Sequence, residues 1–243
     1  MIMHSISLEL RIEFTSRWHM GSGEGSPAAD RIVQRDGMGR PYIPASTLKG
    51  VVRESCERLS RALGYPEPAD PHTSAFASAS DFLPLAKVES PVDALFGNRY
   101  EGGELFFRDA YQLAEEMPPT TQVTSRTAMY RGLRTARTKH LFSTEYAGGG
   151  TFLTTVDGYH RQLVTTGDGA VPFAYCVMIA GILNVDRMGG DKSSGAGAIN
   201  LHVTKLSYNG RAIELLRILE NLGDSDLVEL YTLFRADQMK EGS

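Results

Sequence analysis

Apolar and polar residues alternate along the first part of the chain. Positions 6, 8, 10, 12 and 14 are apolar, and polar or charged residues stand between them. A period of two is typical of a strand that buries one face. Comparable patterns predict further strands over 103–109, 151–156 and 198–203. A short hairpin is predicted around residues 36–39.

Apolar residues at helical spacing predict two main helices. The first begins near Ser46, an expected N-cap, and ends before Gly64 and Pro66. The second, 171–185, is expected to be buried on all sides. A helical turn is predicted over 92–96, amphipathic helices over 213–222 and 227–239, and an irregular segment over 66–91.

The predicted order of elements is strand, helix, strand, strand, helix, strand. We therefore predict an α+β fold of the ferredoxin-like (RRM-like) class, built as a split β-α-β arrangement. RNA-recognition domains share this architecture, but a fold alone does not give a function. Residues 117–144, a stretch of about 30 residues between the second and third predicted strands, indicate a projection from the fold rather than a turn.

Composition narrows the class of protein. The 243 residues carry a net charge of −4, so the chain is not uniformly basic. Its two cysteines are expected to be buried free thiols, and no Cys/His pair has the spacing of a zinc site. The N-terminal residues alternate and do not resemble a signal peptide, and segment 171–185 is too short and broken to span a bilayer. We expect a soluble, cytoplasmic protein.

Positive charge is concentrated in one stretch of this acidic chain. Residues 117–144 contain no Asp or Glu, and Tyr130 and Phe142 stand among the cations. Cations interleaved with aromatic residues suit an RNA backbone with stacked bases, whereas the alternative is a solvated loop. The cations are Arg126, Arg131, Arg134, Arg137 and Lys139.

A glycine-rich loop over residues 188–197 is a second candidate site. Closely spaced glycines let backbone N–H groups approach a phosphate, and a lysine and two serines add donors. It is not a P-loop, because Ala196 rather than Lys follows the glycine. A simple turn is the alternative. The candidate residues are Gly190, Lys192, Ser193, Ser194 and Gly195.

The start of the first helix and the preceding loop offer further candidates. Hydroxyl groups at a helix N-terminus with two basic residues just inside suit an anion, although a plain N-cap with solvated cations gives the same pattern. In the loop after the first strand, Asp30 stands alone, and a lone aspartate there is normally a turn residue. The other candidates are His19, Gly21, Ser46, Thr47, Lys49 and Arg53.

Four motifs in this order resemble the RAMP superfamily of CRISPR-associated proteins. They are the glycine loop 18–23, the segment 41–50 with Arg53, the block 95–98 with 103–110, and the glycine-rich loop 189–197. The chain is most similar to the repeated backbone subunit of type III effector complexes, over about residues 5 to 205. Ala45 stands where the family usually has glycine.

The resemblance implies one RAMP domain with a palm, a thumb and C-terminal helices. The palm would comprise about 1–116 and 147–210, the thumb about 117–146, and the helices about 211–239. It implies that copies of the chain form a filament on a CRISPR RNA, with a target RNA and other effector subunits as partners and no membrane. The candidate residues above, apart from Asp30, would contact RNA.

The resemblance also implies chemistry at Asp30. In active members an aspartate in this loop cleaves target RNA at regular intervals, with Mg²⁺ or Mn²⁺ held at the same carboxylate. A non-catalytic structural subunit is the main alternative. Two others are a guide-processing endoribonuclease that uses His19, and a phosphate-binding small-molecule enzyme.

Overall fold

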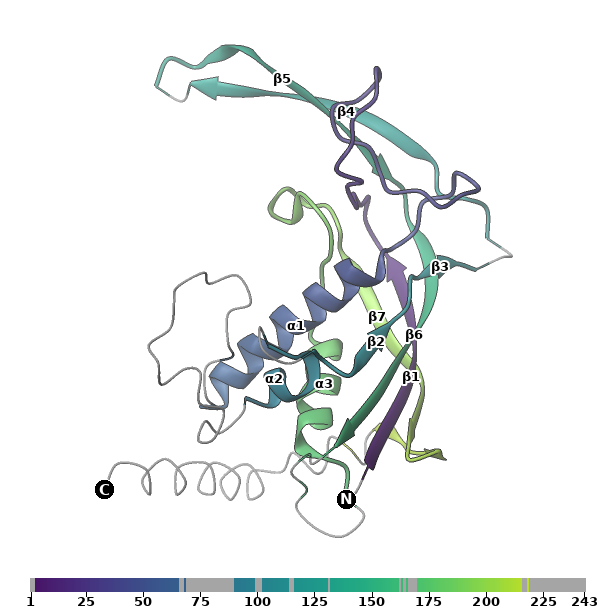
Figure 1. Cartoon of the computed structure of the whole chain (residues 1–243). Helices are drawn as coiled ribbons and strands as arrows, with labels where there is room; N and C mark the ends of the chain where they lie inside the picture. The colour runs from purple at the N-terminus through teal and green to yellow at the C-terminus, as the bar shows by residue number, and fades with distance from the viewer. Residues whose placement is uncertain are drawn as a thin grey trace.

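An antiparallel sheet forms the body of the molecule (Figure 1). Its long central strand pairs with a neighbour on each side. With one of the two neighbours the pairing is continuous, from Met3 opposite Arg161 to Phe14 opposite Gly150. The strand order is β2-β6-β1-β7-β8, and β3 also pairs with β6. The strands are β1 (Met3–Phe14), β2 (Leu105–Phe107), β3 (Tyr111–Gln112), β6 (Gly150–Arg161), β7 (Ile199–Tyr208) and β8 (Arg211–Ala212).

This computed structural model describes most of the chain. The described residues are 3–65, 68, 90–98, 102–113, 116–130, 132–161, 163, 165, 170–215 and 218. Arg131, nearly all of the 66–91 segment and the predicted helix 227–239 lie outside them, and the predicted helix 213–222 is described only at residues 213–215 and 218.

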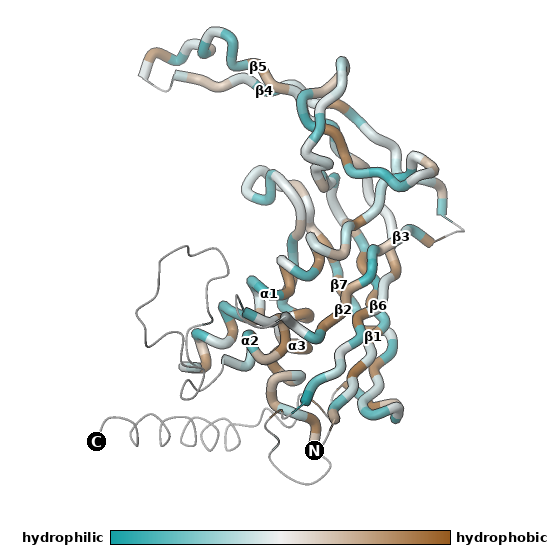
Figure 2. Tube along the Cα trace, viewed as in Figure 1, coloured by the Kyte–Doolittle hydropathy of each residue, from teal (hydrophilic) through white to brown (hydrophobic). Residues whose placement is uncertain are grey.

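Three helices cover one face of the sheet (Figure 1). They are α1 (Ala45–Ala62), α2 (Pro91–Phe96) and α3 (Phe173–Leu183). Nine of the eleven residues of α3 are buried. Figure 2 shows α3 as mostly hydrophobic, whereas hydrophobic and hydrophilic residues alternate along β1 and β6. Helix α1 packs closely on α3 at Gly181, where a Cβ atom would lie 2.4 Å from the sulfur of Cys56.

The fold class predicted from the sequence is confirmed. Strands β2-β6-β1-β7 are antiparallel and two long helices lie on one face, which is the ferredoxin-like arrangement. Both cysteines are buried and unpaired, as predicted, and burial raises their pKa values to about 12. Among the described residues, no helix is both long and apolar enough to cross a membrane.

The prediction of Ser46 as the N-cap of the first helix is wrong. Helix α1 begins at Ala45, and its N-cap Pro44 makes no side-chain cap. The Ala45 N–H instead donates to the Asp109 carboxylate, with an N···O distance of 2.7 Å. A carboxylate 64 residues away therefore accepts a hydrogen bond from one of the N–H groups that have no partner within the helix at this end.

A long hairpin projects from the sheet (Figure 1). It consists of β4 (Thr121–Tyr130) and β5 (Thr135–Ala147), which pair with each other as a separate two-stranded sheet. The pairing shifts register between Thr127 and Met129. Residues 132–142 are all exposed, so the distal part of the hairpin makes few contacts with the body.

A buried polar network lies between α3 and the sheet. Nδ1 of His160 is 2.8 Å from the Tyr175 hydroxyl, and Nδ1 of His4 is 2.7 Å from the Tyr208 hydroxyl. Both histidines are buried, and desolvation lowers their pKa values. The imidazoles are therefore held neutral inside the fold.

This network should make the folded state less stable in mild acid. A histidine with a lowered folded-state pKa binds its proton more readily when unfolded, so stability is lost as pH falls below its unfolded value of 6.5. We expect a loss of up to about 1.4 kcal/mol per pH unit for each such histidine. Thermal unfolding between about pH 7.5 and pH 5.5 measures this, above the range in which carboxylates titrate.

The variant His160→Gln provides the matched comparison, because glutamine cannot take up the proton. Its unfolding midpoint should be lower than that of the wild type near neutral pH and should fall less steeply toward acid. A wild-type midpoint that is constant or rises as pH falls would contradict the prediction.

Candidate nucleic-acid interface and candidate catalytic carboxylate

The distal hairpin presents exposed cations, one of which lies beside an aromatic ring. Arg134 lies in the turn, and Arg137 and Lys139 follow on β5. The Arg137 guanidinium stands 5.5 Å from the centre of the Tyr130 ring. Within the described chain, no ion pair engages these three cations. The tip therefore offers positive charge and stacking surface to solvent.

Asp30 is held against the hairpin. Its carboxylate oxygen Oδ2 accepts hydrogen bonds from the Ser143 backbone N–H (2.6 Å) and hydroxyl (2.9 Å) on β5. These two donors lower the pKa of Asp30, which keeps the exposed carboxylate ionised at neutral pH. The next residue, Arg31, forms a parallel bridge with Thr144. The loop that carries Asp30 is thus attached to the base of the hairpin.

A second carboxylate-to-backbone contact reinforces this attachment. Glu145 accepts from the Val33 N–H (3.0 Å) and forms an ion pair with Arg35 (2.7 Å). Arg35 also donates to the hydroxyl of Thr121 on β4 (3.3 Å). Residues 30–35 and the two hairpin strands therefore form one hydrogen-bonded unit.

The glycine-rich loop packs against the segment that follows β1. The Gly190 N–H donates to the His19 carbonyl and the Gly197 N–H to the Arg17 carbonyl, both at 2.8 Å. Gly197 has φ of +75°, and a Cβ atom there would lie 2.1 Å from the Met188 carbonyl oxygen. Glycine is therefore required for this close approach of two backbones.

This packing corrects the expected role of the loop backbone. The N–H groups of Gly190 and Gly195 already donate to the carbonyls of His19 and Lys192. They are therefore not available to surround a phosphate. Gly195 provides a left-handed conformation, with φ of +87°, and at Gly190 a Cβ atom would lie 3.0 Å from a guanidinium nitrogen of Arg31. The side chains of Lys192, Ser193 and Ser194 are exposed on a short 3₁₀ turn.

Charged residues from three segments meet at the base of the hairpin. Asp191 lies 3.7 Å from Arg31 and 3.6 Å from Arg126, measured between carboxylate oxygens and guanidinium nitrogens. Its carboxylate also accepts from the Tyr146 hydroxyl. That hydrogen bond, followed by the two arginines, lowers the pKa of Asp191. Arg17 lies over the ring of the same Tyr146. We call Arg17, Arg31 and Arg126 the arginine cluster.

The candidates at the first helix have internal partners. Lys49 Nζ donates to the Leu105 carbonyl (3.2 Å), and Arg53 contacts the Glu57 carboxylate (2.8 Å) and the Gly97 carbonyl (3.0 Å). Both side chains are only partly exposed, so they contribute to packing of α1 against β2 and α2. Ser46 is exposed and Thr47 is partly exposed in the first turn of α1.

His19 does not lie at the surface as the loop position suggested. Its side chain is 2% exposed, and Nδ1 is 2.7 Å from the Glu145 carbonyl oxygen. Burial lowers its pKa, so the ring is neutral near pH 7. This geometry does not support the interpretation of His19 as the general acid or base of a guide-processing enzyme. Gly21, two residues on, is exposed.

Four residues of the site were not singled out from the sequence. Arg17, Ser143, Tyr146 and Asp191 come together only through contacts across long stretches of chain. All four stand inside or beside segments that were singled out: Asp191 in the glycine-rich loop, Arg17 directly before the glycine-loop motif, and Ser143 and Tyr146 in the predicted thumb. Nothing in a single sequence distinguishes them from ordinary surface residues.

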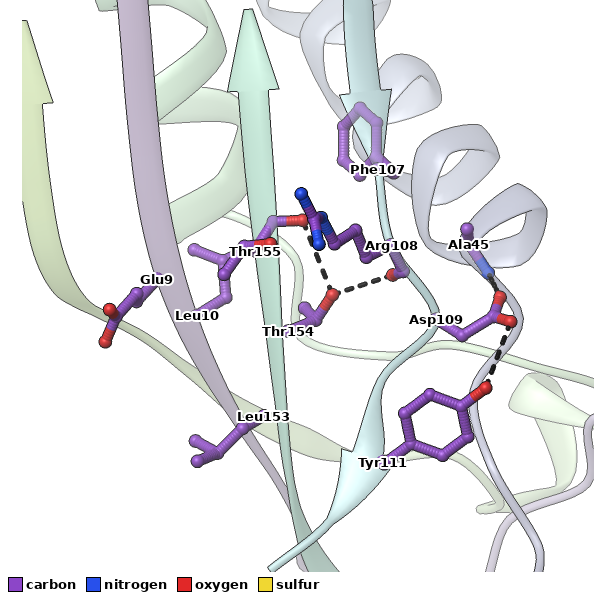
Figure 3. A pocket seen from close by; sticks show the side chains of 10 residues that line it. All are labelled: Glu9, Leu10, Ala45, Phe107, Arg108, Asp109, Tyr111, Leu153, Thr154 and Thr155. Atoms are coloured by element: carbon purple, nitrogen blue, oxygen red, sulfur yellow. Dashed lines mark hydrogen bonds between the residues drawn. The ribbon is translucent and has the colours of Figure 1, made fainter. Parts of the chain in front are cut away.

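A cavity of about 700 Å³ lies away from this site, beside β1, β2, β3 and β6 (Figure 3). Its lining includes Arg108, Asp109, Tyr111 and Thr154, and the Asp109 carboxylate is bound to the start of α1. None of the predicted site residues lines it. The cavity and the candidate interface are therefore separate features.

The described residues do not provide a metal site on their own. Among them, no group of three or more His, Cys, Asp or Glu side chains could hold an ion. Asp30 is a single carboxylate with one oxygen already bonded to Ser143. The expected Mg²⁺ or Mn²⁺ therefore does not fit a ligand set made by the described chain alone.

Comparison with known proteins gives a match to one family and to a solved structure. A model of the RAMP superfamily matches residues 11–200. A chain in the cryo-EM structure of the Type III-B Cmr-beta complex bound to cognate target RNA has a similar fold, with a TM-score of 0.54 and 14% sequence identity. The match covers 81% of this chain and 96% of that chain. No curated protein matches the sequence.

Proposed function

Because this chain belongs to the RAMP superfamily, we propose that it is a CRISPR RNA-binding backbone subunit of a type III-like effector complex. Copies of the chain would form a filament along one guide RNA, with other effector subunits, and the guide would pair with a target RNA. The observation that carries the proposal is the projecting hairpin, whose tip exposes Arg134, Arg137 and Lys139, with Arg137 beside the ring of Tyr130.

Two further observations support RNA as the ligand. The arginine cluster and the exposed Lys192 lie where the hairpin joins the sheet, so positive charge continues from the tip to the body. The similar fold in the Cmr-beta structure belongs to a complex bound to cognate target RNA. Phosphate contacts of this kind give affinity without reading sequence, which suits a subunit whose guide supplies specificity.

We further propose that Asp30 promotes cleavage of the target RNA. In this reaction the ribose 2′-oxygen attacks the adjacent phosphorus, the bond from phosphorus to the 5′-oxygen breaks, and a 2′,3′-cyclic phosphate and a 5′-hydroxyl result. The ionised Asp30 carboxylate accepts the 2′-hydroxyl proton, and water donates the proton that the 5′-oxygen gains. Ser143 holds Asp30 in a fixed position, and a nucleotide unstacked beside it can reach the in-line geometry that the attack needs.

A divalent cation belongs to this proposal only as a ligand shared with RNA. If present, it would neutralise charge that develops on the phosphate. The chain would offer the Asp30 carboxylate, and RNA oxygens and water would complete the coordination. No step above depends on it.

A non-catalytic structural subunit is the second candidate. It is favoured by the single, solvent-exposed carboxylate and by the lack of a metal-ligand cluster in the part of the chain that is described. Both candidates share the same RNA-binding role and differ only in the source of the cleavage activity.

Co-expression with a CRISPR array and the partner subunits tests the shared role. The purified material should form large assemblies, absorb strongly at the nucleic-acid maximum and lose that absorbance after nuclease treatment. An RNA-free monomer under these conditions would rule the proposal out. It would also favour the small-molecule enzyme considered from the sequence.

A further inference from the structure

Three arginines gather around one aromatic ring and one carboxylate at the base of the hairpin. The guanidinium carbon of Arg17 lies 4.6 Å from the centre of the Tyr146 ring, and that of Arg126 lies 5.5 Å from it. Arg31 and Arg126 both face Asp191. Because each arginine comes from a different segment, the site exists only in the folded chain.

The ion pairs in this cluster are loose. Their distances, 3.7 Å and 3.6 Å, exceed the roughly 2.7–2.9 Å of a close charge-assisted hydrogen bond. The Arg31 side chain is 44% exposed and that of Arg126 is 26% exposed. A guanidinium group has several N–H donors, so both arginines keep donors for another partner. Positive charge also exceeds negative charge among these residues.

The Asp191 carboxylate is held in place by more than the arginines. The Tyr146 hydroxyl donates to it, and Asp191 adopts a left-handed conformation, with φ of +59°, at the start of the 3₁₀ turn. The hydrogen bond from Tyr146 is the largest cause of its lowered pKa, so the group is anionic at neutral pH. An anion is thus built into the centre of a cationic site.

We propose that Asp191 occupies the place of an RNA phosphate and competes with it for Arg31 and Arg126. This inference rests on the proposed RNA binding and adds its regulation. A phosphodiester that approaches the arginine cluster has to share these arginines with a fixed carboxylate of the same charge. Asp191 therefore weakens binding of any RNA strand, and it lowers the affinity for RNA that is not held by additional contacts along a guide.

The test measures binding of a fluorescent single-stranded RNA to the purified full chain at several salt concentrations. The variant Asp191→Asn removes the charge and keeps an oxygen that can accept from Tyr146. We expect it to bind RNA about fivefold more tightly than the wild type. The dependence of log K on log salt should become steeper by about 0.7, the value for one more phosphate contact on a single strand.

Two control variants separate the charge in the cluster from other effects. Asp186→Asn makes the same change of charge at an exposed residue just before the loop and should alter affinity by less than about twofold. Tyr146→Phe removes the hydrogen bond but no charge, and its salt dependence should equal that of the wild type. Asp191→Ser is a second neutral variant for the case in which Asp191→Asn does not fold.

Each outcome decides between the possibilities. If folded Asp191→Asn or Asp191→Ser binds RNA no better than the wild type, or if Asp186→Asn gives the same gain, the inference is wrong and Asp191 only positions the arginines. If the wild type binds no RNA at any salt concentration, the proposed function itself fails. Thermal unfolding of each variant establishes that the folded state is being compared.

Discussion

Asp30→Ala should abolish cleavage of target RNA by the assembled complex, with a fall in rate of about a hundredfold or more. The reason is that Asp30 is an ionised, exposed carboxylate fixed by Ser143, at the junction of the loop and the hairpin. Guide content should be unchanged and target affinity should not fall, because the residue carries no positive charge. Gel analysis of a labelled target, with single-turnover rates, measures the loss and the spacing of the products.

Asp36→Asn is the matched control for this experiment. Asp36 stands in the same segment, and its carboxylate accepts from the N–H groups of Met38 and Arg40 within a turn. Its asparagine variant should cleave at the wild-type rate. Asp30→Asn, which can still accept from Ser143, tests whether charge or position is needed. Undiminished periodic cleavage by Asp30→Ala would establish the non-catalytic structural subunit instead.

Reversal of charge at the hairpin tip should weaken RNA binding by about a hundredfold or more. The change combines Arg134→Glu, Arg137→Glu and Lys139→Glu, three exposed positions that have no ion pair within the described chain. Loss of phosphate contacts should also make the salt dependence shallower by about 0.7 for each contact removed. Fluorescence anisotropy at a series of salt concentrations measures both quantities.

The control for charge reversal lies on the sheet, away from the hairpin. It changes the net charge by the same amount at three exposed positions: Arg108→Glu next to β2, Arg161→Glu on β6 and Arg211→Glu on β8. This variant should lose much less affinity and keep the wild-type salt slope. Equal losses in the two triple variants would mean that net charge, and not the hairpin, determines binding.

Local sequence pattern was sufficient for the long strands of the sheet and for the helices on it, but not for the two-residue strands β3 and β8. The alternation from Ile6 to Phe14 identified β1, because a strand with one covered face has to alternate. The run from 171 to 185 identified α3, which is buried on nearly every side. Helix α1 was also predicted, but the hydrogen bond at its N-terminus was not, since the acceptor Asp109 lies 64 residues away in the sequence.

The candidate site was predictable only in part, for a similar reason. The unusual charge of segment 117–144 and the loop position of Asp30 are properties of the sequence. The contact of Asp30 with Ser143 joins residues 113 positions apart, and that of Tyr146 with Asp191 joins residues 45 apart. Lys49 and Arg53 have the residue types expected at an anion site, but their charges are turned toward carbonyl and carboxylate groups of the protein.

The irregularity between Thr127 and Met129 divides the hairpin into two parts with different attachments. The proximal part holds Ser143 and Glu145, and through them the loop that carries Asp30. The distal part holds the turn and the exposed cations, and its residues 132–140 are all exposed. The length of the hairpin tip is thus separate from the contacts that position Asp30. A related chain can have a longer or shorter tip without displacing the carboxylate.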